Sequence, residues 1–150
     1  MKIILDTNIL VHAYNAGSPS HAKAAGILRD SLEGNLEAAI TSQIIFEFYA
    51  VITDPRRISH PLSPAKAAEI CAAIWNAYEI EKISQSTLTP NVVLQLASEL
   101  ELAGADLFDC VLAVTAKENN INTIYTQNTE DFKRFGFLTV LNPLENHVAA

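Results

Sequence analysis

The sequence predicts an α/β fold, with a parallel sheet of about five strands between two layers of helices. Short apolar or β-branched segments alternate along the chain with longer segments of helical periodicity. Four of the five residues that precede Asp6 are apolar, which is typical of a strand buried on both faces of a parallel sheet. Alternating β and α elements favour parallel strands that are joined by right-handed crossovers.

The strands of this sheet are predicted from apolar segments that lie between turn-forming residues. They cover residues 1–5, 37–41, 79–84, 121–126 and 138–141. The segment 121–126 is rich in β-branched side chains, which favour extended backbone. Helices are expected between the strands.

Six segments have helical patterns. They cover residues 9–15, 21–32, 42–53, 63–78, 89–103 and 106–119. Ser20 and Ser63 stand where a hydroxyl could cap a helix N-terminus, and Pro90 stands in a first turn, where it needs no N–H partner. The residues between 126 and 131 are expected to form a polar turn.

Length and composition favour one domain over residues 1–150. The chain is 49% hydrophobic and has no Gly-, Pro- or Ser-rich stretch, so disorder is not expected. Cys71 and Cys110 lie in apolar helical patterns without metal-ligand spacing and are predicted to be reduced core residues. Lys2 and Asp6 interrupt the N-terminal apolar segment, which argues against a signal peptide or a membrane span. We therefore expect a soluble cytoplasmic protein.

The formal net charge of -7 argues against a broad nucleic-acid-binding surface, which is normally basic. Acidic residues that converge on divalent cations would be neutralised locally, however. Charge alone leaves open both a metal-dependent nuclease and an acidic protein that does not bind nucleic acid.

Asp6, Thr7 and Asn8 follow the first predicted strand directly. Ligands of open α/β sheets bind at the carboxyl ends of the strands, and a carboxylate at the end of a buried strand needs a partner there. Asp6 is therefore a candidate site residue. The alternative is that its side chain only caps the helix that follows.

Further polar residues fall at comparable junctions. Glu47 lies in an otherwise apolar helix after the second strand, although an ion pair with Arg56 or Arg57 would also explain it. Asp106 fits an N-cap, whereas Asp109 opens a helix that is apolar nearly all round. Polar residues also follow the fourth strand, at Thr126, Asn128 and Asp131.

Carboxylates that meet at one sheet edge suit phosphodiester hydrolysis. The reaction needs a deprotonated water and stabilisation of charge on the phosphate and the leaving oxygen. Two divalent ions ~4 Å apart can provide both, and Mg²⁺ and Mn²⁺ prefer oxygen ligands. His12, His21, His60 and His147 are scattered, without the spacing of a metal site.

The same residues resemble a known family. Its motifs appear here in order as Leu5-Asp6-Thr7-Asn8-Ile9-Leu10, Glu47, Asp109-x-x-Leu112-Ala113-x-x-Ala116 and Tyr125-Thr126-x-Asn128-x-x-Asp131-Phe132. This ordered set resembles the PIN domain, and especially the VapC-type toxin ribonucleases, over essentially the whole chain. The resemblance implies a central parallel sheet of order 3-2-1-4-5. It also implies an Mg- or Mn-dependent endoribonuclease that uses a metal-activated water.

The resemblance also implies roles for individual residues. Asp6, Glu47 and Asp109 would be metal ligands and catalytic residues, and Asp131 would be a fourth catalytic carboxylate or only a turn residue. The supporting residues would be Thr7, Asn8, Thr126 and Asn128. Asn128 departs from the family pattern, because Asp is frequent there. Asp106 could replace or assist Asp109.

Partners follow from the resemblance too. RNA would be the substrate, with weak phosphate contacts expected from Arg56, Arg57, Lys133 and Arg134. A small antitoxin protein would mask the site. Homodimerisation would use the helices 63–78 and 90–102, which carry Trp75 and Tyr78. The alternatives are a catalytically idle PIN-like module that binds RNA or protein and, less favoured, an aspartyl-nucleophile phosphatase.

Overall fold

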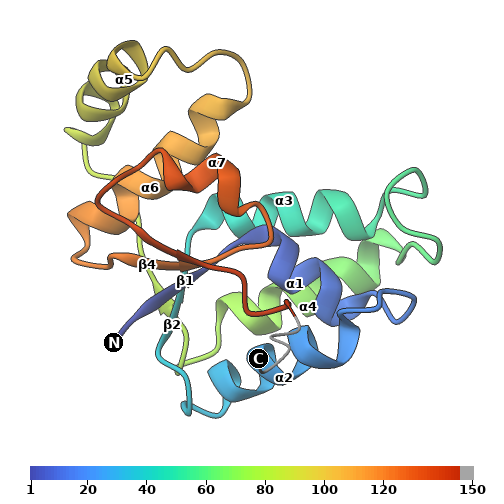
Figure 1. Cartoon of the computed structure of the whole chain (residues 1–150). Coiled ribbons are helices and arrows are strands. Elements are labelled where there is room, and N and C mark those ends of the chain that lie inside the picture. Colours follow the sequence, from blue (N-terminus) through green and yellow to red (C-terminus); the bar gives the residue numbers. More distant parts are fainter. Residues whose placement is uncertain (146–150) are drawn as a thin grey trace, which may run out of the picture.

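The computed structural model describes residues 1–145 and contains a five-stranded parallel sheet (Figure 1). The strands are β1 (Ile3–Leu5), β2 (Ala38–Ile40), β3 (Glu81–Lys82), β4 (Thr123–Tyr125) and β5 (Thr139–Leu141). Their spatial order is β3-β2-β1-β4-β5, and every neighbouring pair is parallel. The predicted fold class and strand order are confirmed. His147 lies outside the described residues.

Helices cover both faces of the sheet. They are α1 (Thr7–Tyr14), α2 (His21–Leu32), α3 (Ser42–Ile52), α4 (Pro64–Trp75), α5 (Thr89–Glu99), α6 (Asp106–Glu118) and α7 (Thr129–Lys133). In one group, α1 packs against α2 and α3, and α3 packs against α4. In the other, α6 packs against α5 and α7, on the opposite side of the sheet in Figure 1. Crossovers that reverse direction beside β1 produce this three-layer arrangement.

The strand register brings the ends of β1 and β4 together. Leu5 pairs with Tyr125, and the backbone N–H of Asp6 donates to the Tyr125 carbonyl at 3.0 Å. Asp6 and Thr126 therefore leave the sheet side by side. Ile4 and Leu5 are fully buried beneath them, because strands of a parallel sheet are covered on both faces.

Three helices end with the same backbone reversal. The Schellman motif joins the backbone N–H of the third residue past the helix to a carbonyl five positions earlier, with a left-handed residue between them. That residue is Gly34 after α2, Glu101 after α5 and Asn120 after α6, with φ of 78°, 54° and 60°. The joining bonds run from Asn35 to Asp30, Leu102 to Ala97 and Ile121 to Ala116, at 2.8–2.9 Å. These reversals send the chain back toward the sheet.

Several predicted boundaries were wrong. The helix predicted over 63–78 ends at Trp75, because Asn76 donates its side-chain amide to the Ala72 carbonyl at 2.8 Å and terminates the last turn. The helix predicted to reach residue 103 ends at Glu99, at the reversal just described. The expected polar turn after Thr126 contains a short helix, α7, which buries Phe132.

The other expectations at this level concern burial. Cys71 and Cys110 are free thiols with little exposure, as predicted. Within residues 1–145, no helix has the length and apolar character that crossing a bilayer requires.

Candidate active site

Asp6 is the most buried of the predicted site acids, with 9% of its surface exposed. It is the N-cap of α1, and its Oδ1 accepts from the Thr7 backbone N–H at 2.8 Å. Its Oδ2 accepts from Thr126 Oγ1 at 2.7 Å and from Asn8 Nδ2 at 3.2 Å. The carboxylate is thus held by three donors in one orientation.

Thr126 and Asn8 tie the start of α1 to the end of β4. Asn8 Nδ2 lies 3.3 Å from Thr126 Oγ1, and Asn8 Oδ1 accepts from the Gln127 backbone N–H at 3.0 Å. Thr126 Oγ1 also accepts from the Asn128 backbone N–H at 3.0 Å. The four predicted supporting residues therefore surround Asp6, except that Thr7 places its hydroxyl on a different acid.

Glu47 is that second acid. Thr7 Oγ1 donates to Glu47 Oε2 at 2.9 Å, and Gln43 Nε2, one turn earlier on α3, donates to Oε1 at 2.8 Å. The suggested ion pair with an arginine was wrong for Arg56, which pairs with Asp54 at 3.0 Å. Glu47 is thus oriented by two neutral donors, and no ion pair among residues 1–145 compensates its charge.

Repulsion and burial act on Asp6 and Asp109 together. Burial raises the pKa of Asp6, with a smaller rise from the charge of Glu47, while hydrogen bonds from Thr126, Thr7 and Asn8 oppose the rise. Burial and, to a smaller extent, the charges of Asp6 and Asp131 together raise the pKa of Asp109 to about 6, although Arg134 acts to lower it. A bound cation would relieve this repulsion.

Asp106 has a different role from the predicted one. The N-cap of α6 is Ala105, and Asp106 is the first helical residue without a capping hydrogen bond. The predicted cap was wrong because the Asp106 carboxylate turns to Arg134 Nη1, at 3.3 Å. Arg134 Nη2 also lies 3.7 Å from Asp109 and 3.9 Å from Asp131. Arg134 is therefore a counter-ion for three acids on α6 and α7.

An open cleft of about 470 Å³ lies where these elements meet. Its lining includes Asp6, Glu47, Asp109 and Asn128, whereas Asp106 and Asp131 are not among the lining residues. The three predicted metal ligands thus come from three separate crossovers to one concave surface. Open α/β sheets bind their ligands at such a place.

The predicted phosphate contacts divide into two classes. Arg57 lines the cleft, whereas the adjacent Arg56 is salt-bridged to Asp54. Lys133 pairs with Glu130 at 2.9 Å on the surface, and Arg134 is engaged by acids. Of these four, Arg57 is the one placed to meet a phosphate in the cleft.

Sequence reasoning missed His12, which lines the cleft one turn after Asn8. Its Nε2 hydrogen-bonds Gln127 Oε1 at 2.8 Å, and its Nδ1 hydrogen-bonds Ser18 Oγ at 2.6 Å. The signal was helical spacing, since Asn8 and His12 recur on the face of α1 that also carries Val11, and the C-cap Asn15 follows on the same side of the cleft. The spacing between the histidines gives no such signal.

The fit of this site to a metal rests on donor chemistry. Among residues 1–145, no three His, Cys, Asp or Glu side chains are already grouped closely enough to hold an ion. Asp6, Glu47 and Asp109 nevertheless line one cleft, and carboxylate oxygens are the ligands that hard divalent cations prefer. The residues fit such an ion, with side-chain adjustment on binding.

The acids at the carboxyl ends of a 3-2-1-4-5 parallel sheet define a class of protein, the PIN domain. The family model of the PIN domain matches residues 3–138. The chain therefore belongs to the PIN domain family. It is 30% identical over 140 residues to Ribonuclease VapC24 of Mycobacterium tuberculosis, covering 93% of this chain and 95% of that protein. It is 27% identical over 143 residues to Ribonuclease VapC43 of the same organism, covering 95% and 96%.

Solved structures show the same fold. VapBC2 from Rickettsia felis, solved bound to a DNA fragment from its promoter, superposes with a TM-score of 0.67 at 24% identity, covering 95% of this chain and 98% of the other. VapC20 of Mycobacterium tuberculosis, a toxin that cleaves the sarcin-ricin loop, superposes with a TM-score of 0.63 at 19% identity, covering 91% and 96%.

Proposed function

We propose that this chain is a divalent-metal-dependent endoribonuclease, with Mg²⁺ or Mn²⁺ as the metal. The observation that carries the proposal is the convergence of Asp6, Glu47 and Asp109, from three crossovers, on one cleft. The VapC ribonucleases that resemble it along nearly the whole chain support the same reaction. The site takes residues from both the N-terminal and the C-terminal part of the chain. We therefore propose that residues 1–150 act as one domain.

The three acids would hold the metal, which when bound would activate water and neutralise charge on the phosphate. Thr126 and Asn8 fix the Asp6 carboxylate, and Thr7 and Gln43 fix Glu47, so neither acid needs to reorganise extensively. Arg57 would contact a phosphate of the bound RNA by a charge-assisted hydrogen bond. Asn128 adds a neutral amide to the cleft.

We further propose that the protein is the cytoplasmic toxin of a toxin–antitoxin pair. Relatives of this fold are described as toxin–antitoxin complexes, including one from Klebsiella pneumoniae. A homodimer is proposed through α5, on which Leu94 is 61% exposed. The other helix expected at this interface, α4, lies on the opposite side of the sheet, and Tyr78, which is 94% exposed, follows its end. Large exposed apolar side chains of this kind favour a protein interface.

The experiment is cleavage of a mixed RNA pool by purified protein with Mn²⁺, in parallel with EDTA. Asp6→Asn removes one charge at nearly constant shape and should abolish cleavage without unfolding the protein. Asp30→Asn, at an exposed position on α2, is the matched control and should retain wild-type activity. Metal-dependent cleavage that persists in Asp6→Asn would overturn the proposal. RNA binding without cleavage by the wild type would favour a catalytically idle binding module.

A further inference from the structure

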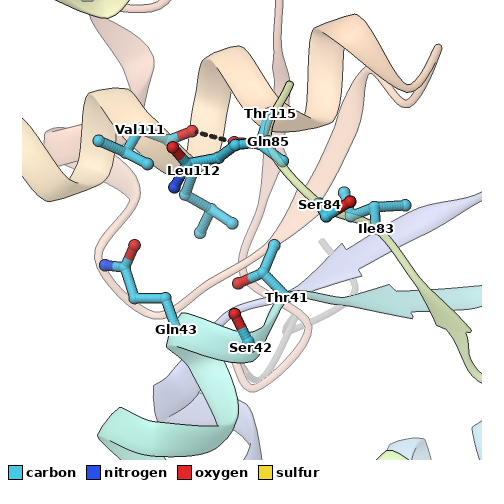
Figure 2. A pocket seen from close by; sticks show the side chains of 9 residues that line it. All are labelled: Thr41, Ser42, Gln43, Ile83, Ser84, Gln85, Val111, Leu112 and Thr115. Atoms are coloured by element: carbon cyan, nitrogen blue, oxygen red, sulfur yellow. Dashed lines mark hydrogen bonds between the residues drawn. The ribbon is translucent and has the colours of Figure 1, made fainter. Parts of the chain in front are cut away.

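A second, smaller cavity lies beside the acidic cleft, between the start of α3, the segment after β3, and the middle of α6 (Figure 2). We call it the α3–α6 pocket. It is lined by Thr41, Ser42, Gln43, Ile83, Ser84, Gln85, Val111, Leu112 and Thr115. Its volume is about 170 Å³. This is well above the ~30 Å³ that one water occupies and below the ~300–1,000 Å³ of drug-sized pockets. It therefore suits a single small ring system.

The polar side chains of the α3–α6 pocket are largely unengaged. Within residues 1–145, the hydroxyls of Ser42 and Ser84 and the amide of Gln85 make no hydrogen bond to the protein, and all three residues are exposed, so these groups are open to a ligand that enters from solvent. Gln43 uses its Nε2 on Glu47, which leaves its Oε1 available. Thr115, by contrast, donates its hydroxyl to the Val111 carbonyl at 2.7 Å, drawn as the dashed line in Figure 2. Donors and acceptors thus remain for a ligand.

The rest of the lining identifies the class of ligand. Ile83, Val111 and Leu112 supply apolar walls, and none of the lining residues carries a charge. A phosphate or a charged peptide side chain would lack a counter-ion there. A flat, neutral ring with hydrogen-bonding edges matches both the walls and the free groups. A nucleobase has this chemistry.

The α3–α6 pocket is coupled to the acidic cleft through two helices. Gln43 lines the pocket and holds Glu47, one turn or ~6 Å further along α3. Leu112 lines the pocket one turn after Asp109 on α6. A nucleotide whose phosphate lies at the acids could therefore place a neighbouring base in the pocket.

We infer that the α3–α6 pocket binds one unstacked base of the RNA next to the scissile phosphodiester, and that it sets the nucleotide preference at that position. Single-stranded RNA is recognised by extruding bases into such pockets and reading their edges. This inference rests on the proposed ribonuclease function and names a determinant of its substrate choice.

The test uses short oligoribonucleotides that contain one preferred cleavage site and an abasic residue at each position in turn. For the wild type, we expect one abasic position beside the cut to lower kcat/KM about 10-fold, since its base contacts are lost. Ser84→Phe fills the pocket and should make cleavage insensitive to that same position. Thr139→Phe, at an exposed position on β5 away from the pocket and from the proposed dimer surface, is the control and should keep the 10-fold effect.

A second pair of variants leaves the pocket open. Gln85→Ala should relax the base preference in mapped cleavage ends and lower kcat/KM on the preferred RNA about 3- to 10-fold. Asn35→Ala, at an exposed amide side chain after α2, should change neither. Binding of the same oligonucleotides to Asp6→Asn protein provides a readout that is independent of cleavage, and the abasic position should weaken it.

The outcomes separate this inference from the ribonuclease proposal. If wild-type protein cleaves no RNA, the proposed function fails. If it cleaves, but Ser84→Phe and Gln85→Ala keep the wild-type response to every abasic position, the base-binding role is overturned. Loss of self-association in Ser84→Phe with unchanged base preference would likewise overturn it and assign the pocket to a protein interface.

Discussion

Asp6 caps α1 and faces the acidic cleft at the same time. The predicted cap is confirmed, and the position of Asp6 in the cleft is compatible with the site role, which stays a prediction. One oxygen accepts from the Thr7 backbone N–H, and the other accepts from Thr126 and Asn8. Each oxygen retains acceptor capacity, because a carboxylate has about four lone-pair sites. The hydrogen bonds that cap α1 therefore also fix the orientation of the Asp6 carboxylate in the cleft.

Asp106 and Asp109 can be distinguished by matched substitutions. Asp109→Asn should lower metal-dependent RNA cleavage at least about 100-fold, because it removes a charge that faces the cleft. Asp106→Asn breaks a partly exposed ion pair with Arg134 and should change stability by about 1 kcal/mol or less, with activity within a few-fold of wild type. Initial cleavage rates and urea unfolding would measure both. Equal losses of activity would assign Asp106 to the site.

The raised pKa of Asp109 predicts how stability depends on pH without a divalent ion. Between about pH 4 and pH 6 the folded protein binds more protons at Asp109 than the unfolded chain does, so this contribution to stability falls as pH rises. Asp109→Asn should raise the free energy of unfolding at pH 7.5 by on the order of 1 kcal/mol. The full pKa difference would give more, but the side chain is 31% exposed.

Thermal unfolding in EDTA at pH 5.0 and pH 7.5 would test this prediction. The variant should gain less than the wild type when the pH is lowered. Other acids act in the opposite direction, since the Arg56 hydrogen bond lowers the pKa of Asp54, so the comparison between variants carries the result. If the wild type and Asp109→Asn show the same dependence of stability on pH, the pKa of Asp109 is not raised in the folded protein.

At the residue level, the sequence pointed to acids that the structure brings to one cleft, because their chemistry was visible in the residue type and its place after a strand, while their site roles stay predictions. Asp6, Glu47 and Asp109 each stand out as a carboxylate in an apolar context. His12 and Gln43 did not, because their roles depend on which helix face turns to the cleft and on partners about 115 and 4 positions away. Arg56 and Arg57 were indistinguishable in sequence, and only the turn that they occupy separates them.

At the scale of elements, helix starts were easier to predict than helix ends. Ser63 and Thr41 cap α4 and α3 by accepting from Lys66 and Ile44 backbone N–H groups. The end of α5 was missed because its left-handed residue is Glu101, whereas Gly34 occupies the equivalent position after α2. Glycine is the usual residue there, and glutamate gives no such signal.

Glu101 consequently offers a stabilising substitution. Its φ of 54° costs a non-glycine residue roughly 1–2 kcal/mol, part of which glycine returns as chain entropy in the unfolded state. Glu101→Gly should therefore raise the free energy of unfolding by about 0.5–1 kcal/mol. Glu99→Gly, inside the last turn of α5, should lower it by a similar amount. Urea titration of both variants would decide, and a loss of stability in Glu101→Gly would contradict this account of the helix end.

At the scale of the whole molecule, topology explains why distant acids meet. The strand order β3-β2-β1-β4-β5 places β2 and β4 on either side of β1, so the segments after all three open onto one edge. The alternation of elements predicted the parallel sheet, but the strand order came from resemblance, because pairing between distant strands leaves little trace in local sequence. The net charge of -7 is compatible with this site, since cations can neutralise its acids locally.

The most direct test of the account is whether the acids act as one unit. Initial rates of Mn²⁺-dependent RNA cleavage should be measured for Asp6→Asn, Asp109→Asn and the double variant. If both carboxylates serve one site, each single variant should lose at least about 100-fold, and the double variant should be little worse than either. Losses that multiply in the double variant, or single variants that cleave at the wild-type rate, would contradict a shared catalytic centre.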